Sequence, residues 1–108
     1  MDLDIVVTEL DMKESDYTAS AEVRDRMVAD EVRRYLDTVL AQKHVAGVVT
    51  WGLADSHSWL EVLEEDYRRF PGAWSKGDGP GLNRGLPYDA SMRRKPMYRA
   101  IEAAFQGR

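Results

Sequence analysis

Two short runs of β-branched residues flank a long amphipathic segment, and this order limits the fold more than any other feature of the sequence. The first run lies in a strand expected at about Asp4 to Thr8, and the second run spans Val45 to Thr50. Uninterrupted apolar runs of this kind are typical of strands buried on both faces, as in a parallel sheet. The sequence therefore predicts a βαβ unit with parallel strands and a right-handed crossover.

The segment between the two runs has the periodicity of an amphipathic helix. Thr18 or Ser20 is the expected N-cap, and the helix should continue to about Gln42. Its apolar residues form one stripe that needs a sheet to cover it; they are Val23, Met27, Val28, Val32, Tyr35, Leu36, Val39 and Leu40. Two charged pairs in favourable i,i+4 order indicate a solvated opposite face: Glu22 with Arg26, and Asp30 with Arg34.

The second half of the chain has fewer regular signals. A capping-box pattern at Ser58–Glu61 predicts a short helix from about Trp59 to Arg69. Pro71 to Pro87 contains five glycines and three prolines, which do not sustain regular structure for long. A last helix is expected from near Pro96, with Gly107 as its terminator. Its apolar face comprises Met97, Ile101, Ala104 and Phe105.

Two motifs place candidate functional side chains where the predicted strands end. Thr8–Glu9–Leu10–Asp11 closes the first strand, and Trp51–Gly52, with Asp55 and Trp59 further on, follows the second. In a (β/α)8 barrel this end of the strands is the face where chemistry is built. Each residue also has an ordinary structural explanation: an acidic residue there is often a cap or turn residue, and a tryptophan is often part of the core.

Together these motifs resemble glycoside hydrolase family 10, the endo-β-1,4-xylanases. Leu86–Asp89 and Arg94–Ile101 are similar to the C-terminal end of that family, so the resemblance covers nearly the whole chain. A complete (β/α)8 barrel typically needs about 250 residues, whereas this chain has 108. The resemblance therefore implies an α/β fold: a parallel β-α-β-α segment, residues 1–108, that forms the C-terminal quarter of a TIM-barrel catalytic domain.

The resemblance also implies roles for four residues. Glu9 would be the nucleophile of a retaining mechanism, in which a second carboxylic acid about 5–5.5 Å away protonates the leaving oxygen. Asp11 would belong to a network that orients the nucleophile, although capping the following turn explains it equally well. Trp51 and Trp59 would wall a sugar subsite, because indole faces suit the apolar C–H patches of pyranose rings. The acid/base of the family lies in an Asn-Glu motif, and this chain contains no such pair.

The remaining polar and aromatic residues are interpreted structurally. Glu14, Glu61, Glu64 and Glu65 are expected to be solvated charges, and Trp74 to pack within its loop. His44 and His57 lack the close spacing of zinc motifs, and the chain has no cysteine, so neither a metal nor another cofactor is expected. A net charge of −4 gives no footprint for nucleic acid or an anionic membrane.

These observations favour a piece of a xylanase that acts on β-1,4-xylosidic bonds in xylan and lacks its acid/base, so the isolated chain should be catalytically incomplete. The alternative is a small non-catalytic carbohydrate-binding or self-associating module that uses the same tryptophans. The parent enzyme would be secreted or periplasmic. Because a two-stranded sheet leaves open edges, we expect the chain to form a homo-oligomer through them.

Overall fold

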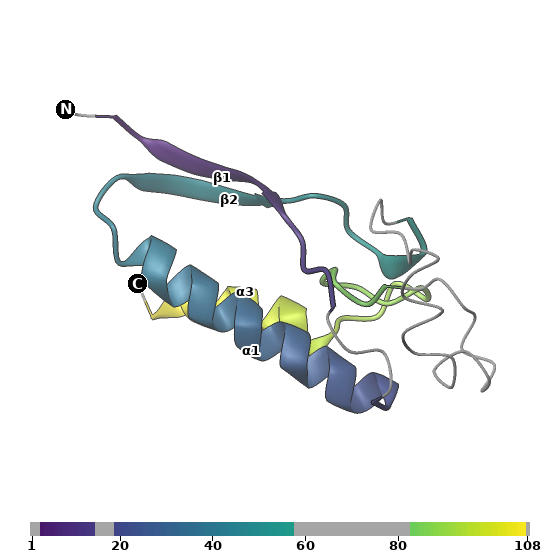
Figure 1. The fold of residues 1–108 in the computed structure, drawn as a ribbon. Coiled ribbons are helices and arrows are strands. Elements are labelled where there is room, and N and C mark those ends of the chain that lie inside the picture. The colour runs from purple at the N-terminus through teal and green to yellow at the C-terminus, as the bar shows by residue number, and fades with distance from the viewer. Residues whose placement is uncertain (1–2, 15–18, 58–82, 108) are drawn as a thin grey trace.

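A computed structural model of the chain describes residues 3–14, 19–57 and 83–107. Along the chain these contain β1 (Ile5–Leu10), α1 (Ala21–Leu40), β2 (Val45–Thr50), the short 3-10 helix η1 (Asp55–His57) and α3 (Pro96–Gln106). The two strands are parallel neighbours, and they lie in one layer over α1 and α3, which pack against each other (Figure 1). The predicted parallel β-α-β-α segment is therefore confirmed. The helix expected over Trp59–Arg69 and the loop around Trp74 lie outside the described residues.

Helix α1 begins where its sequence supplies a cap. The Ser20 hydroxyl accepts a hydrogen bond from the Val23 backbone N–H at 3.3 Å, so Ser20 rather than Thr18 is the N-cap. The apolar stripe is buried along its centre, at Val28, Ala29, Val32, Leu36 and Leu40. Met27 and Tyr35 were expected in the stripe, but they are 45% and 44% exposed. Each lies beside the central row, where neither the sheet nor α3 covers it.

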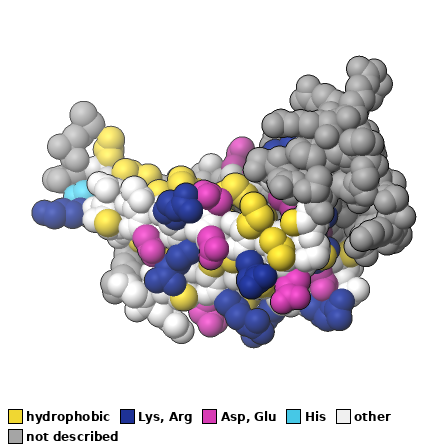
Figure 2. Space-filling view, turned by 60° about the horizontal axis from the view of Figure 1, so that its bottom comes forward, with side chains coloured by type: hydrophobic (Ala, Val, Ile, Leu, Met, Phe, Trp, Pro, Cys, Tyr) yellow, Lys and Arg dark blue, Asp and Glu magenta, His cyan; other side chains and the backbone are white. Residues whose placement is uncertain are grey.

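The polar side of α1 is solvated, as the sequence predicts. Glu22, Arg26, Asp30 and Arg34 are all exposed. Arg34 pairs with Glu31 at 2.9 Å, and Arg33 pairs with Asp37 at 2.8 Å. Figure 2, in which the lower side of Figure 1 is turned forward, shows Lys and Arg side chains mixed with Asp and Glu side chains. Among the described residues, neither helix is both long and apolar enough to cross a bilayer.

Helix α3 starts at Pro96, as predicted, because a residue in the first turn needs no N–H for the helical ladder. Gly107 is the C-cap, in a right-handed conformation with φ of −79°. Met97 and Ala104 are buried against α1 and the strands, whereas Phe105, expected on the apolar face, is 37% exposed. One core joins both strands and both α-helices; its buried members are Leu10, Val28, Val32, Leu36, Leu40, Val45, Met97 and Ala104.

The expectation that both strands are buried on both faces is wrong for this chain. Val7 and Val48 pack on the core, together with Leu10 and Val45. In contrast, Ile5, Val6 and Val49 are 51%, 49% and 54% exposed, respectively. For Val6 and Val49 the physical reason is that, within the described part of the chain, helices cover one face of the sheet and nothing covers the other (Figure 1). Ile5 is the first residue of β1.

Hydrogen bonds join the connector after β1 to the loop that precedes α3. The Met12 N–H donates to the Gly85 carbonyl at 3.1 Å, and the Gly85 N–H donates to the Asn83 side-chain oxygen at 2.8 Å. A Cβ atom at Gly85 would overlap the Met12 carbonyl oxygen, whereas a Cβ at Gly47 in β2 would meet nothing within 4 Å. Only glycine therefore allows this close approach of two backbones.

Leu36→Ala is expected to lower the free energy of unfolding by about 2–5 kcal/mol, because Leu36 is fully buried and its loss leaves a cavity in the core. Met27→Ala, on the same helix but 45% exposed, should cost well under half of that amount. Urea unfolding of both variants at one chain concentration measures the difference. Equal losses for the two variants would contradict the core described above.

Gly85→Ala is expected to destabilise the chain by about 1–3 kcal/mol, because the added methyl group forces two backbone segments apart. Gly47→Ala is the matched control, and it should leave the stability unchanged or raise it by about 0.4–1 kcal/mol through a lower entropy of the unfolded chain. Thermal unfolding followed by circular dichroism compares the two. A Gly85→Ala variant as stable as the parent chain would show that the loop and the connector are not in close contact.

Candidate functional site

The carboxyl ends of the two strands meet at one edge of the sheet. Leu10 at the end of β1 is paired with Thr50 at the end of β2, and the Leu10 carbonyl accepts a hydrogen bond from the Trp51 N–H at 2.9 Å. The backbone of Trp51, the residue after β2, therefore lies beside the end of β1 that carries Glu9, as the parallel order predicts. Both residues are exposed, and Trp51 is 47% exposed, which does not fit a core tryptophan.

A local irregularity of β1 sets the position of Glu9. Val7 is paired with Val48 and Leu10 with Thr50, so β1 has one residue more than β2 over this interval. This is a β-bulge, and bulges occur frequently beside active sites, where they re-aim a side chain. Val7 and Leu10 both pack on the helix side, while Thr8 and Glu9 are both exposed. The extra residue thus leaves Thr8 and Glu9 exposed between two residues that pack on the core.

Asp11 lies just beyond β1, partly buried and with an interaction partner. With Glu9 it lines a hollow of about 520 Å³, whose other wall comes from the exposed side of α1, including Glu31, Arg34 and Tyr35. Trp51 is not among the residues that line this hollow. The structure therefore brings Glu9 and Asp11 to one surface, and Trp51 next to Glu9 only through the strand ends.

The structure describes less of the other candidate residues from the sequence. Trp59 lies outside the described residues, and of His57 only the backbone, in η1, is described. His44 is exposed in the turn before β2. No group of three acidic or histidine side chains in the described ranges is arranged to hold a metal ion.

Sequence reasoning missed a buried ion pair behind the Trp51 loop. Lys95 is 3% exposed, and its ammonium group donates to Asp55 Oδ2 at 2.8 Å and to the Arg84 carbonyl. Asp55, also 3% exposed, accepts a second hydrogen bond at Oδ1 from the Leu86 N–H at 3.2 Å. Burial raises the pKa of the Asp55 carboxyl above its ordinary value, because this effect outweighs the lowering by the Lys95 ammonium group.

Further buried charges continue from this pair toward β1. The Arg84 guanidinium donates to both carboxylate oxygens of Asp25 at 2.7 and 2.9 Å, and this hydrogen bonding raises the pKa of Arg84. Lys95 Nζ lies 3.7 Å from Asp25 Oδ1. Asp25 thus connects the loop before α3 with the first turns of α1.

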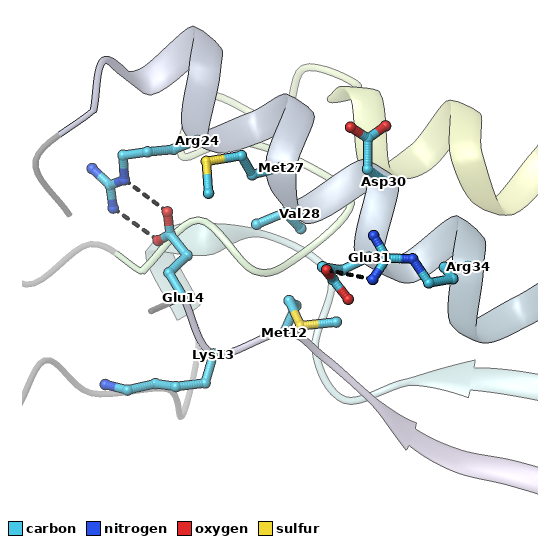
Figure 3. Close-up of a pocket in the computed structure, with 9 residues that line it drawn as sticks. All are labelled: Met12, Lys13, Glu14, Arg24, Met27, Val28, Asp30, Glu31 and Arg34. Carbon is cyan, nitrogen blue, oxygen red and sulfur yellow. Dashed lines mark hydrogen bonds and ion pairs between the residues drawn. The ribbon is translucent and has the colours of Figure 1, made fainter. Parts of the chain in front are cut away.

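Glu14 completes the network, and its prediction as a solvated charge is wrong. Its side chain is 4% exposed and binds the Arg24 guanidinium through two hydrogen bonds of 2.7 and 2.8 Å (Figure 3). Glu14 Oε2 also accepts the Arg84 N–H at 2.8 Å. The sequence suggested a solvated charge because Glu14 lies in a polar connector; burial arises only when the loop around Arg84 folds over it.

A hollow of about 370 Å³ lies beside the Glu14–Arg24 pair, between the connector and α1. Met12, Met27 and Val28 line it with charged residues around them (Figure 3). Because Glu14 is bound to Arg24 and Glu31 to Arg34, these four charges are already balanced within the chain.

One feature of the sequence could have revealed part of this network. Asp25 lies three residues before Val28 and seven before Val32, which places a carboxylate on the apolar stripe of α1. A charge in that position requires a buried partner. Its partner Arg84 is 59 residues away in the chain, and no local pattern identifies it.

Known proteins of one family are similar to this chain. Residues 1–104 match the sequence model of glycosyl hydrolase family 10. The chain is 27% identical over 106 residues to endo-1,4-beta-xylanase A of Halalkalibacterium halodurans, an alignment that covers 89% of this chain and 24% of that protein. It is 23% identical over 104 residues to endo-1,4-beta-xylanase 2 of Aureobasidium pullulans, covering 96% and 24%, respectively.

Solved structures give the same result. Native xylanase 10B from Thermotoga maritima matches with a TM-score of 0.64 and 26% identity, covering 97% of this chain and 28% of that one. Xylanase 10B from Thermotoga petrophila, solved in complex with xylobiose, matches with a TM-score of 0.64 and 25% identity, covering 97% and 27%. The chain spans about a quarter of the length of these (β/α)8-barrel relatives, and the match over residues 1–104 shows that it belongs to glycosyl hydrolase family 10.

Proposed function

We propose that residues 1–108 are the C-terminal part of a retaining endo-1,4-β-xylanase domain, the part that carries the nucleophile. The observation that carries this proposal is the arrangement at the strand ends. Glu9 lies on a bulge at the end of β1, and the next residue, Leu10, is hydrogen-bonded to Trp51 at the end of β2. A retaining mechanism uses an accessible carboxylate as the nucleophile, and an exposed indole nearby can pack on the sugar ring.

In this proposal Glu9 attacks the anomeric carbon of a xylose unit and forms a glycosyl-enzyme intermediate. Water then hydrolyses the intermediate with retention of configuration. Asp11, on the same surface as Glu9, orients the nucleophile. Trp51 forms one wall of the sugar subsite, and Trp59 is proposed for the other. The substrate is xylan or a xylo-oligosaccharide.

Departure of the sugar leaving group needs a proton from a second carboxylic acid. The family carries that acid in an Asn-Glu motif, and no such pair occurs in this sequence. Glu14, the next glutamate after Glu9, is buried in an ion pair with Arg24 and is therefore unsuited to reach a substrate. The chain on its own is thus proposed to be catalytically incomplete.

A non-catalytic glycan-binding module is the second candidate, and the exposure of Trp51 is compatible with it. Such a module has no use for a carboxylate on a bulge at a strand end. The position of Glu9 therefore favours the enzyme. The two candidates differ in one measurable property, which is whether Glu9 is needed for bond cleavage once an acid is supplied.

The isolated chain is expected to release no more reducing sugar from xylan than its Glu9→Gln variant. Without proton donation to the leaving group, a factor of roughly 10²–10⁴ in rate is lost, and most walls of the cleft are missing as well. A reducing-sugar assay on both purified proteins makes the comparison. Clear activity that depends on Glu9 would mean that a carboxylate of this chain replaces the acid.

A chimera tests Glu9 directly. This chain replaces the matched quarter of xylanase 10B from Thermotoga maritima, which supplies the rest of the barrel. Turnover of an aryl xylobioside should be abolished by Glu9→Gln, since the nucleophile acts in the transition state. Trp51→Ala should raise KM and lower kcat. Glu22→Gln, which alters an exposed carboxylate of α1, is the control and should leave both unchanged; near-normal turnover by the Glu9→Gln chimera would exclude Glu9 as the nucleophile.

We also propose that the isolated chain self-associates through its strands. In the described residues the sheet has only β1 and β2, so each strand has a neighbour on one side alone. Val6 and Val49 expose apolar side chains beside these open edges. Unpaired edges of this kind bind other copies readily, and two strands are fewer than independent stability usually requires.

Multi-angle light scattering at micromolar concentration should therefore give the mass of a dimer or a larger assembly. Val49→Lys should shift the chain toward the monomer, because a lysine blunts an exposed edge. Gln42→Lys adds the same charge in the exposed turn after α1 and should leave the mass unchanged. A cooperative melt of a monomeric parent chain would argue against self-association.

A further inference from the structure

Lys95 occupies a position where helix physics disfavours a lysine. It is the N-cap residue of α3, and its side chain makes no capping hydrogen bond. Ser, Thr, Asp and Asn are preferred at this position because they accept a hydrogen bond from the first turn. A cation is also disfavoured there by the positive end of the helix dipole. Residues that break a local rule of this kind are expected at functional sites.

The ammonium group of Lys95 is used instead to hold the segment that follows β2. It donates to Asp55 at 2.8 Å, and both side chains are at most 3% exposed. The backbone of Lys95 is fixed as well, since its N–H donates to the Pro87 carbonyl at 2.9 Å. Asp55 is four residues after Trp51, so this buried pair lies at the base of the loop that carries Trp51.

Three backbone hydrogen bonds complete the attachment of residues 51–55. The Trp51 N–H donates to Leu10 at 2.9 Å, the Asp55 N–H donates to Tyr88 at 3.0 Å, and the Tyr88 N–H donates to Leu53 at 3.0 Å. The segment that begins at Trp51 is thus hydrogen-bonded to the end of β1 at its start and to the loop before α3 at its end. The Lys95–Asp55 pair is the buried ionic contact of this attachment.

The same pair is joined to the connector that follows Glu9. Lys95 Nζ also binds the Arg84 carbonyl, and Arg84 in turn binds Asp25 with its guanidinium and Glu14 with its N–H. The network contains three basic and three acidic side chains, so its charges balance; they are Glu14, Arg24, Asp25, Asp55, Arg84 and Lys95. It therefore spans from the loop after β2 to the loop after β1.

We propose that Lys95 and Asp55 are positioning residues that hold Trp51 at a set place relative to Glu9. This inference rests on the proposed sugar-binding role of Trp51, but its geometric part does not. A balanced buried network suits such a task, because removing one charge leaves its partner unpaired in a dry environment and displaces the attached loop. Neither residue is proposed to touch the substrate.

The test follows the position of Trp51 in the full chain labelled with 5-fluorotryptophan. The fluorine resonance of Trp51 is assigned with a Trp51→Phe variant. Asp55→Asn keeps an oxygen for the Leu86 N–H but presents an amide to Lys95, and Lys95→Met keeps the apolar stem without the charge. Both variants are expected to shift and broaden the Trp51 resonance under conditions in which circular dichroism shows the helices fully formed.

Arg93→Met is the matched control. It removes a cation two residues from Lys95, from an ion pair with Asp89 at 3.0 Å in which the arginine side chain is 79% exposed. Its Trp51 resonance should stay in place. An unchanged Trp51 resonance in folded Asp55→Asn and Lys95→Met would overturn the inference. So would unfolding of both variants, because a positioning pair should leave the core of α1 and α3 intact.

Titration with xylotriose separates this inference from the proposed function. In the parent chain the sugar should move the Trp51 resonance at millimolar concentration, and in both variants a several-fold higher concentration should be needed. If the variants shift the resonance but xylotriose never does, the positioning role stands and the sugar site does not. If xylotriose binds the parent and both variants equally, with Trp51 in the same place, the pair does not position the site.

Discussion

The fold depends on the burial of one helical stripe under two parallel strands. Val28, Val32 and Leu36 of α1 can leave water only if β1 and β2 lie side by side above them and α3 closes the flank. Because a helix separates the strands, they run parallel, and their carboxyl ends meet at one edge. The backbone of Trp51 lies next to the end of β1 as a consequence of this packing, and its hydrogen bond to Leu10, the residue after Glu9, joins the two strand ends.

A second constraint is electrostatic. Beside the apolar core the chain buries a set of ion pairs, and such pairs contribute little net stability when they replace apolar packing, since desolvation offsets their attraction. The role proposed for them is geometric, because Lys95 Nζ binds both the Asp55 carboxylate and the Arg84 carbonyl in a buried site. Hydrogen bonds thereby connect the loops that follow β1 and β2 to the loop before α3 and to the start of α3.

The open surfaces have the same origin as the fold. A family 10 barrel closes its sheet on itself, and this chain matches about a quarter of the length of its relatives. Val6 and Val49 on the uncovered face of the sheet, and Met27 and Tyr35 beside the charged side chains of α1, are exposed. A barrel would cover both with further strands and helices. These side chains are therefore of the kind found in a protein interior, but in the described chain they lie at the surface.

The sequence by itself determined the elements and their order. Apolar periodicity gave β1, α1, β2 and α3, Ser20 and Pro96 marked where the helices begin, and the Thr-Glu-Leu-Asp and Trp motifs identified the family. These signals are local, because each depends on residues a few positions apart. The tertiary structure alone decided the burial of Glu14 and Lys95 and the exposure of Ile5 and Met27. Burial depends on which distant segments fold over a residue, and the partners Asp25 and Arg84, or Asp55 and Lys95, are too far apart in the chain for any local pattern to join them.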